Sequence, residues 1–423
     1  MEALREVWVT GLGLVSSLGE GHQAHWDALT RTPSSPVRID ATRFAPYSVH
    51  PLADVDIDRL ISSKTERKQM GIWQRLGVHA AGLALQDAGV AGDEQVLDRM
   101  DLVVAAGNGE RDLAFDAKVL AQLTSGDCQS DPDVAARVLN GALTTGLRPT
   151  LYLGELSNLL AGNIQIVHKV TGSSRTLKGE EISGLSAIED AVRRVASGQA
   201  DIVLVGGALN SERNDLLLNY ELAGGLWSHP FVPVWQRDAQ GGGFVLGTAA
   251  AFIVIEARDH AEQRGAKGYA RIAQVVTDRC ARRVPGEISA SLAKLATRLA
   301  DDLADGALAV LSGASGAAPA TAEELSFLRD HIGAGRAPVA VRAYGSCLGH
   351  SVEAHAPMGL ALAALALSHD DFYPPFEEPP DAVSAGNTSR DTRPVRILLT
   401  SVGHWSGEGL ALVEKIGEGA RTA

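Results

Sequence analysis

The sequence alternates short runs of β-branched and aliphatic residues with longer stretches of helical periodicity, and this alternation allows few folds. The runs 7–10, 102–105 and 202–205 are each followed closely by glycine, as in buried strands that end at a tight turn. Residues 76–88 and 182–196 place apolar residues three and four positions apart, which predicts helices. Further strands are expected at residues 244–246, 251–256, 307–311, 339–341 and 397–400. We therefore predict an α/β protein whose sheets are covered on both faces.

The composition of the 423 residues excludes several classes of protein. Hydrophobic residues make up 45% and charged residues 21%, which rules out wholesale disorder. The formal net charge of −13 would repel polyphosphate, so we expect no nucleic-acid partner. Cys128, Cys280 and Cys347 share no CxxC spacing, which predicts neither a zinc site nor a disulfide framework. The N-terminus lacks a secretory pattern and no apolar run approaches ~20 residues, so we expect a cytoplasmic protein without a membrane partner.

Three stretches of the sequence carry a resemblance to a known family. Residues 9–19 begin with a strand pattern and a glycine turn, residues 197–208 join a helix end to a strand, and residues 244–267 follow at a similar spacing. In this order the stretches resemble the β-ketoacyl synthase family of the thiolase fold, from residue 7 to about 416. The resemblance implies two similar halves, residues 1–256 and 257–416, in a five-layer α/β/α/β/α arrangement, followed by a tail at 417–423.

The resemblance also implies where the catalytic residues of the family should lie. Ketosynthases use a cysteine at a helix N-terminus and two histidines. Here Glu181 stands at the cysteine position, Ser312 at the first histidine, and Gly345 at the lysine that precedes the second histidine. His350 keeps the second histidine, and His404 stands at the position of the gating phenylalanine. We therefore expect no catalytic residue and no condensing activity from the chain alone.

This pattern of losses resembles the chain length factors, catalytically silent ketosynthase homologues of type II polyketide synthases. Chain length factors commonly carry glutamine at the cysteine position. Glu181 differs from glutamine by one functional group. This difference favours a highly reducing, polyene-forming system over one that makes aromatic polyketides. The resemblance implies a heterodimer with a ketosynthase subunit, an acyl carrier protein that brings the growing chain, and no cofactor. Ala105 and Asp112 stand at positions that line the far end of the substrate tunnel, and residues 151–166 are expected in the contact with the partner.

Several residues keep a second interpretation. Glu180 and Glu181 can interact favourably with the dipole of the helix they begin, without any catalytic role. Alternatively, Glu181 can assist decarboxylation. Asp112 can cap a helix that runs through residues 115–120 instead of facing the tunnel. His350 can be a hydrogen-bonded relic of an ancestral site. Cys347, in the loop before His350, is expected to be a buried packing residue.

Two other functions remain open. The chain could be an independent malonyl decarboxylase or acyltransferase that uses Glu181 and His350, or it could be a homodimeric protein that binds acyl chains. A zinc site at His350 and His355 lacks a third ligand at a suggestive spacing, so we expect no metal.

Overall fold

Most of the strands form one large sheet. A computed structural model describes residues 4–31, 37–147, 151–303, 308–333, 340–377 and 393–417. The 11-stranded sheet has the order β11-β10-β12-β13-β9-β1-β8-β6-β4-β5, with β2 paired to β1. Its strands are β1 Val7–Ser16, β2 Gly19–Glu20, β4 Asp101–Ala105, β5 Ser174–Leu177, β6 Ile202–Leu209, β8 Ala249–Ala257, β9 Ala270–Asp278, β10 Leu308–Ser312, β11 Ala340–Ala343, β12 Arg396–Val402 and β13 Glu408–Glu414. A small second sheet pairs β3 Val49–His50 with β7 Leu246–Gly247.

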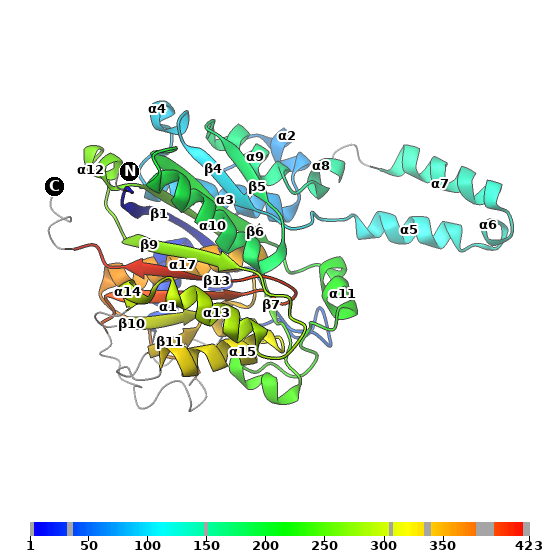
Figure 1. Ribbon diagram of the computed structural model, residues 1–423. Coiled ribbons are helices and arrows are strands. Elements are labelled where there is room, and N and C mark those ends of the chain that lie inside the picture. The colour runs from blue at the N-terminus through cyan, green and yellow to red at the C-terminus, as the bar shows by residue number, and fades with distance from the viewer. Residues whose placement is uncertain are drawn as a thin grey trace.

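Helices lie on both faces of the large sheet (Figure 1). The α-helices are α1 Gly21–Thr30, α2 Lys64–Gln69, α3 Ile72–Asp87, α4 Glu94–Leu97, α5 Leu113–Leu123, α6 Gly126–Ser130, α7 Pro132–Gly146, α8 Leu151–Glu155, α9 Leu159–His168, α10 Glu180–Ala196, α11 Asn214–Leu222, α12 Arg258–Gln263, α13 Glu287–Thr297, α14 Ala300–Leu303, α15 Ala320–Phe327, α16 Gly345–Leu348 and α17 His355–His369. Short 3₁₀ or π turns are η1 Val234–Gln236, η2 Asp238–Gln240, η3 Leu328–Ile332 and η4 Val352–Ala354.

The pairing of the strands repeats once along the chain. In the first set, β4 runs parallel to β5 and β6, while β8 runs antiparallel to β6 and β1. In the second set, β10 runs parallel to β11 and β12, while β13 runs antiparallel to β12 and β9. The sets meet where β1 pairs antiparallel with β9. This repeat confirms two similar halves; the boundary at residue 256 stays a prediction, and residues 418–423 of the expected tail lie outside the described residues.

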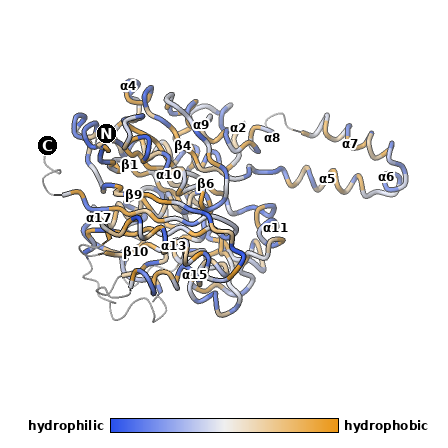
Figure 2. Tube along the Cα trace, viewed as in Figure 1, coloured by the Kyte–Doolittle hydropathy of each residue, from blue (hydrophilic) through white to orange (hydrophobic). Residues whose placement is uncertain are grey.

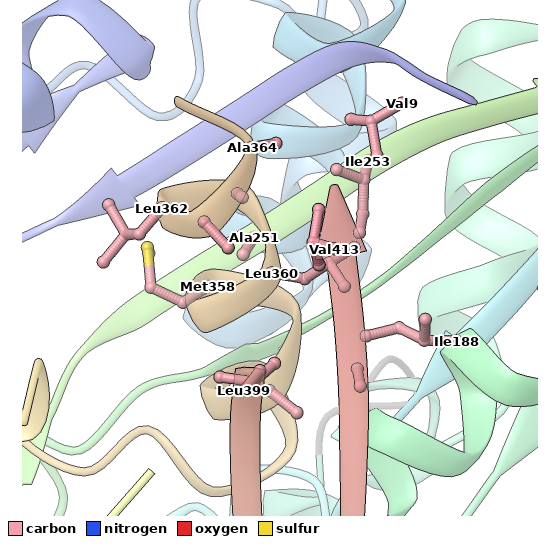
Figure 3. Packing of buried hydrophobic residues seen from close by; sticks show 14 of the residues in the cluster. Val9, Ile188, Ala251, Ile253, Met358, Leu360, Leu362, Ala364, Leu399 and Val413 are labelled. Carbon is pink, nitrogen blue, oxygen red and sulfur yellow. The ribbon is translucent and has the colours of Figure 1, made fainter. Parts of the chain in front are cut away.

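Three apolar clusters separate the layers. The central cluster packs α10 and α17 between the two halves, and Figure 3 shows Leu360 and Leu362 of α17 beside Ala251 of β8 and Leu399 of β12. α17 is buried around its whole circumference, as its almost continuous apolar sequence requires. The outer clusters place α3 and α9 over the first half and α13 and α15 over the second. The layers therefore follow the expected α/β/α/β/α order.

The first strand differs from its expected form. The sequence suggested a strand that stops at a glycine turn after residue 10, but β1 continues through Gly11 and Gly13 to Ser16. The glycines serve close packing instead, because a Cβ atom at Gly13 would lie 1.9 Å from the carbonyl oxygen of Ala80 in α3. The strand expected at 244–246 is also shorter, since only β7 remains of it.

A helical arm projects from the body of the molecule. It consists of α5, α6 and α7, residues 113–146, and Figure 1 shows it extending away from the sheets. α7 contains no buried residue, yet both long helices of the arm carry apolar residues (Figure 2). No sequence pattern had predicted these helices as an arm. No helix of the described residues is long and apolar enough to cross a membrane.

Candidate functional site

The site begins at the N-terminus of α10. Gly179, at φ 149°, and Glu180, at φ 51°, turn the chain sharply from the loop after β5 into the helix. A glycine at the first of these positions accepts this backbone conformation without a steric penalty. The turn carries the next side chain, Glu181, inward, where the residue is only 2% exposed. A carboxyl group is thus placed in the first turn, where the helix dipole favours negative charge.

Glu181 faces His350. The distance from Glu181 Oε1 to His350 Nε2 is 3.3 Å, and both side chains are buried. Burial raises the pKa of the Glu181 carboxyl and lowers the pKa of His350 to about 3. Both shifts favour the uncharged forms, and a carboxyl group and a neutral imidazole can still share a hydrogen bond. A carboxyl–imidazole pair therefore occupies the buried start of α10.

Aromatic rings complete this part of the site. His350 stacks on Phe244 with the ring centroids 5.0 Å apart, and His404 meets the same phenylalanine edge-on at 5.2 Å. His350 also lies 4.4 Å from the ring of His355. Gly403 lies close by, because a Cβ atom there would be 3.2 Å from Glu181 Oε2. The structure thus brings together Glu181, His350 and His404, three residues that the sequence singled out.

Ser312 is held in a separate hydrogen-bond network. It ends β10, and its hydroxyl donates to Glu324 Oε1 over 2.7 Å. Thr400 also bonds to that oxygen, and burial raises the pKa of Glu324. A buried carboxyl is therefore the partner of Ser312, and no sequence pattern had pointed to Glu324.

Gly345 lies between the Ser312 network and the histidines beside Glu181. A Cβ atom at Gly345 would lie 3.0 Å from the carbonyl oxygen of Ala314 and 3.6 Å from the ring of His355. The position therefore lies beside the loop that follows Ser312 and beside the histidine that touches His350. Cys347, two residues on, packs in the central core, and burial raises the pKa of its thiol to about 12.

A cavity of about 720 Å³ opens beside the start of α10. Its described walls include Gly107, Glu180, Arg213, Glu353 and Trp405. Burial raises the pKa of Glu353 and the pKa of Glu180 to about 7. Glu353 was not predicted from the sequence because no local pattern marks it. Within the described ranges, no three His, Cys, Asp or Glu side chains are arranged to hold a metal ion.

The two residues expected in a tunnel, Ala105 and Asp112, are not among the described residues that line this cavity. Ala105 packs in the central apolar cluster. Asp112 is the N-cap of α5, where its Oδ1 accepts the N–H of Phe115 over 3.1 Å. The helix-cap interpretation of Asp112 is thereby confirmed, and its role in a tunnel stays a prediction.

Comparison with known proteins identifies the relatives of the chain. The family model "Beta-ketoacyl synthase, N-terminal domain" matches residues 4–261. The 3-oxoacyl-[acyl-carrier-protein] synthase 2 of Vibrio cholerae is 27% identical over 276 residues, which cover 63% of this chain and 62% of that protein. The enzyme of the same name from Vibrio harveyi is 28% identical over 276 residues, 63% of this chain and 61% of the relative. The chain thus spans less than two thirds of the length of these curated relatives.

Solved structures share the whole fold. The ishigamide ketosynthase/chain length factor aligns with a TM-score of 0.78 at 22% identity, covering 98% of this chain and all of that chain. A type II PKS acyl-carrier protein in complex with its ketosynthase aligns with a TM-score of 0.75 at 18% identity, and a β-ketoacyl synthase from Burkholderia phymatum with 0.76 at 18%, each with the same coverage. At these identities the likeness shows the fold alone.

Proposed function

The chain belongs to the β-ketoacyl synthase family, and we propose that within this family it is a chain length factor, a subunit that pairs with an active ketosynthase and does not condense by itself. The observation that carries the proposal is the buried Glu181 at the start of α10, facing His350. A condensing enzyme needs a soft nucleophile that accepts an acyl group from a thioester. A buried carboxyl with a raised pKa is a poor nucleophile, and an acyl anhydride formed on it would be prone to hydrolysis.

The surrounding groups support the same proposal. Position 312 is a serine, so it offers no imidazole to act on the substrate. Its hydroxyl is hydrogen-bonded to Glu324. The position that the resemblance assigns to a lysine is Gly345, which has no side chain. Only His350 remains of the four positions, and burial lowers the pKa of its ring to about 3. We therefore assign the condensation chemistry to the partner.

Two exposed features support assembly with a partner. β5 ends the sheet, and its Ser174 and Arg175 are exposed. Such an edge presents unpaired backbone groups that another strand can join. The arm carries Leu120, which is 62% exposed, and Leu143 on a helix without buried residues. An arm of three helices that projects from the body buries little apolar surface alone, so a partner surface would stabilise it.

The segment before the arm contacts α8. The N–H of Gly109, which precedes the arm, bonds to the carbonyl oxygen of Glu155 in α8 over 3.3 Å. Tyr152 of α8 and Ile166 of α9 are also exposed. Parts of the stretch 151–166 are therefore accessible for the expected contact, whereas Leu160 and Ile164 pack in the core beneath α3.

The proposed partners are a ketosynthase and an acyl carrier protein that brings the growing chain. One solved structure with this fold is a ketosynthase/chain length factor, and another contains an acyl-carrier protein with its ketosynthase. In the proposed complex, this chain shapes the space that sets product length, in a polyene-forming system. Ala105 and Asp112 remain candidates for that role through contacts made in the complex.

A second candidate function rests on the 3.3 Å contact between Glu181 and His350. This pair could assist the loss of carbon dioxide from a malonyl group, since a neutral imidazole can donate a hydrogen bond to the developing enolate oxygen. In that case the chain alone would release acetyl thioester from malonyl thioester, without an acyl-enzyme.

Reconstitution tests the two functions. The chain, a candidate partner ketosynthase, and their mixture are each incubated with malonyl-loaded acyl carrier protein, and products are identified by mass spectrometry. We expect long-chain product only from the mixture. Condensation by the chain alone, or unchanged product from the ketosynthase without the chain, would contradict the proposal. Acetyl thioester released by the chain alone would identify the decarboxylase.

A further inference from the structure

The carboxyl group of Glu353 lies where a side chain at Gly107 would be. Glu353 lies in η4, directly after the stretch that carries His350, and Gly107 follows β4. A Cβ atom at Gly107 would lie 2.2 Å from Glu353 Oε1 and 3.3 Å from Oε2. A carbon atom cannot approach a carboxyl oxygen this closely, so the carboxyl position depends on the glycine. Both residues line the 720 Å³ cavity.

The carboxyl of Glu353 is not satisfied by the protein around it. The residue is only 5% exposed, and its buried Oε2 has no hydrogen-bond partner among the described residues. Arg213, on the same wall, is committed to Asp215 and to the carbonyl oxygen of Gly109, the latter over 2.8 Å. A buried carboxyl oxygen without a partner is unfavourable, because it has lost its hydrogen bonds to water. A ligand that bonds to this oxygen would remove that penalty.

A second carboxyl faces the same cavity. Glu180 also has a buried oxygen, Oε2, without a partner among the described residues. The pKa of each carboxyl is about 7, so near neutral pH both are substantially protonated. A protonated carboxyl donates one hydrogen bond and accepts others. The matching ligand group also donates and accepts, as a hydroxyl does.

The remaining walls favour an uncharged ligand with an aliphatic body. Apart from Glu180 and Glu353, the walls carry three cationic side chains, Arg111, Lys178 and Arg213, and two carboxyl groups, Glu155 and Asp215. The cationic groups outnumber these two carboxyl groups, so this part of the wall leaves no excess negative charge to attract an ammonium group. Apolar surface comes from Trp73, Leu209, Leu216 and the stacked pair Tyr220–Trp405, whose ring centroids are 5.3 Å apart. The volume is within the range of small-molecule sites.

We infer that this cavity binds an aliphatic chain ending in a hydroxyl group, with the hydroxyl hydrogen-bonded to Glu353. The identification of this ligand as the growing acyl chain rests on the proposed function. The binding of a hydroxyl-terminated chain does not. Glu353 then selects chains by their terminal group. The wall residues named above belong to this chain, so binding is tested on the chain alone.

Calorimetry on the full chain alone tests the site. The probes are three unreactive eight-carbon amides, N-methyloctanamide, its 8-hydroxy derivative and its 8-amino derivative. We expect the hydroxy probe to bind about tenfold more tightly than the methyl-terminated probe. The preference should persist in Glu353→Gln, which keeps a donor and an acceptor, and vanish in Glu353→Leu. Glu377→Gln is the matched control, a buried carboxyl whose pKa is also about 7 but which is not among the cavity-lining residues.

A second variant tests the geometry without changing the carboxyl. Gly107→Ala should displace the carboxyl group of Glu353 and abolish the preference for the hydroxy probe. If Glu353→Leu does not fold, Gly107→Ala takes its place in the test. The inference is wrong if no probe binds the wild-type chain, if the amino probe binds most tightly, or if the preference survives in both Glu353→Leu and Gly107→Ala. Reconstitution with the ketosynthase is read separately, so a failed proposed function and a failed site give different results.

Discussion

The Oε1 atom of Glu181 lies 3.3 Å from Nε2 of His350, at the buried start of α10. Burial favours the uncharged form of each group, so the contact is a hydrogen bond between neutral partners and not an ion pair. In a condensing enzyme the helix N-terminus would stabilise a thiolate. Here the same position holds a carboxyl whose proton is retained by burial.

Replacing the carboxyl by a thiol should not create an enzyme. We expect Glu181→Cys alone to give no condensation product, because Ser312 stays bonded to Glu324 and Gly345 supplies no lysine side chain. Product formation from malonyl-loaded carrier protein is the measurement. A condensation product from this single variant would show that the other positions are dispensable.

The wild-type chain should not become acylated. Burial raises the pKa of the Cys347 thiol to about 12, so almost none of it is thiolate at neutral pH. Intact-mass spectrometry after incubation with acyl thioesters should therefore show the unmodified mass, with an active ketosynthase as positive control. A stable adduct mapped to Glu181 or Cys347 would contradict the proposed silent subunit.

Glu353 makes stability depend on pH. Its pKa is raised from an unfolded value of 4.5 to about 7, so the folded state binds more protons between these values. Stability from this group is present below pH 4.5 and is lost as pH rises through 7. We expect Glu353→Gln to raise the free energy of unfolding by roughly 1–3 kcal/mol at pH 8 relative to wild type, and to leave it nearly unchanged at pH 4.5. Urea unfolding at both pH values checks this, and an equal difference at both would refute it.

What could be predicted from the sequence depended on how local each signal was. Most of the buried strands, α3 and α10 were predictable because continuous apolar runs and helical spacing are local patterns. β9 was missed because it mixes buried and half-buried residues, a weaker signal than a continuous run. β13 was missed although it is buried throughout. Glu353 was missed because its environment depends on Gly107, which is distant in the sequence. Glu181 and His350 were found only through the family resemblance, and their separation could not be read from the sequence.

The arm should contribute to binding the partner. We expect Leu120→Glu to weaken the complex with the ketosynthase at least tenfold, because a charge would be buried in the interface. The melting temperature of the chain alone should stay within about 1 °C, since the side chain is 62% exposed. Leu4→Glu is the control, at a leucine that is 78% exposed outside the arm. Equal affinities for the two variants would remove the arm from the interface.

Product length tests the two tunnel candidates. We expect Ala105→Phe to shorten the product and Asp112→Ala to lengthen it or broaden its distribution. Because Asp112 also caps α5, its loss should cost about 1 kcal/mol of helix stability. Asp112→Asn keeps a capping oxygen and removes the charge, so it separates the two effects. Unchanged product lengths in Ala105→Phe and Asp112→Ala, with the complex intact, would leave length control to other residues.

Sedimentation velocity of the chain mixed with a candidate partner ketosynthase tests the proposed pairing most directly. We predict a 1:1 heterodimer at low micromolar concentration, with an interface burying more than ~2,000 Å² in total. A chain that sediments as a monomer, or as a dimer of itself, beside an unchanged ketosynthase would contradict the pairing.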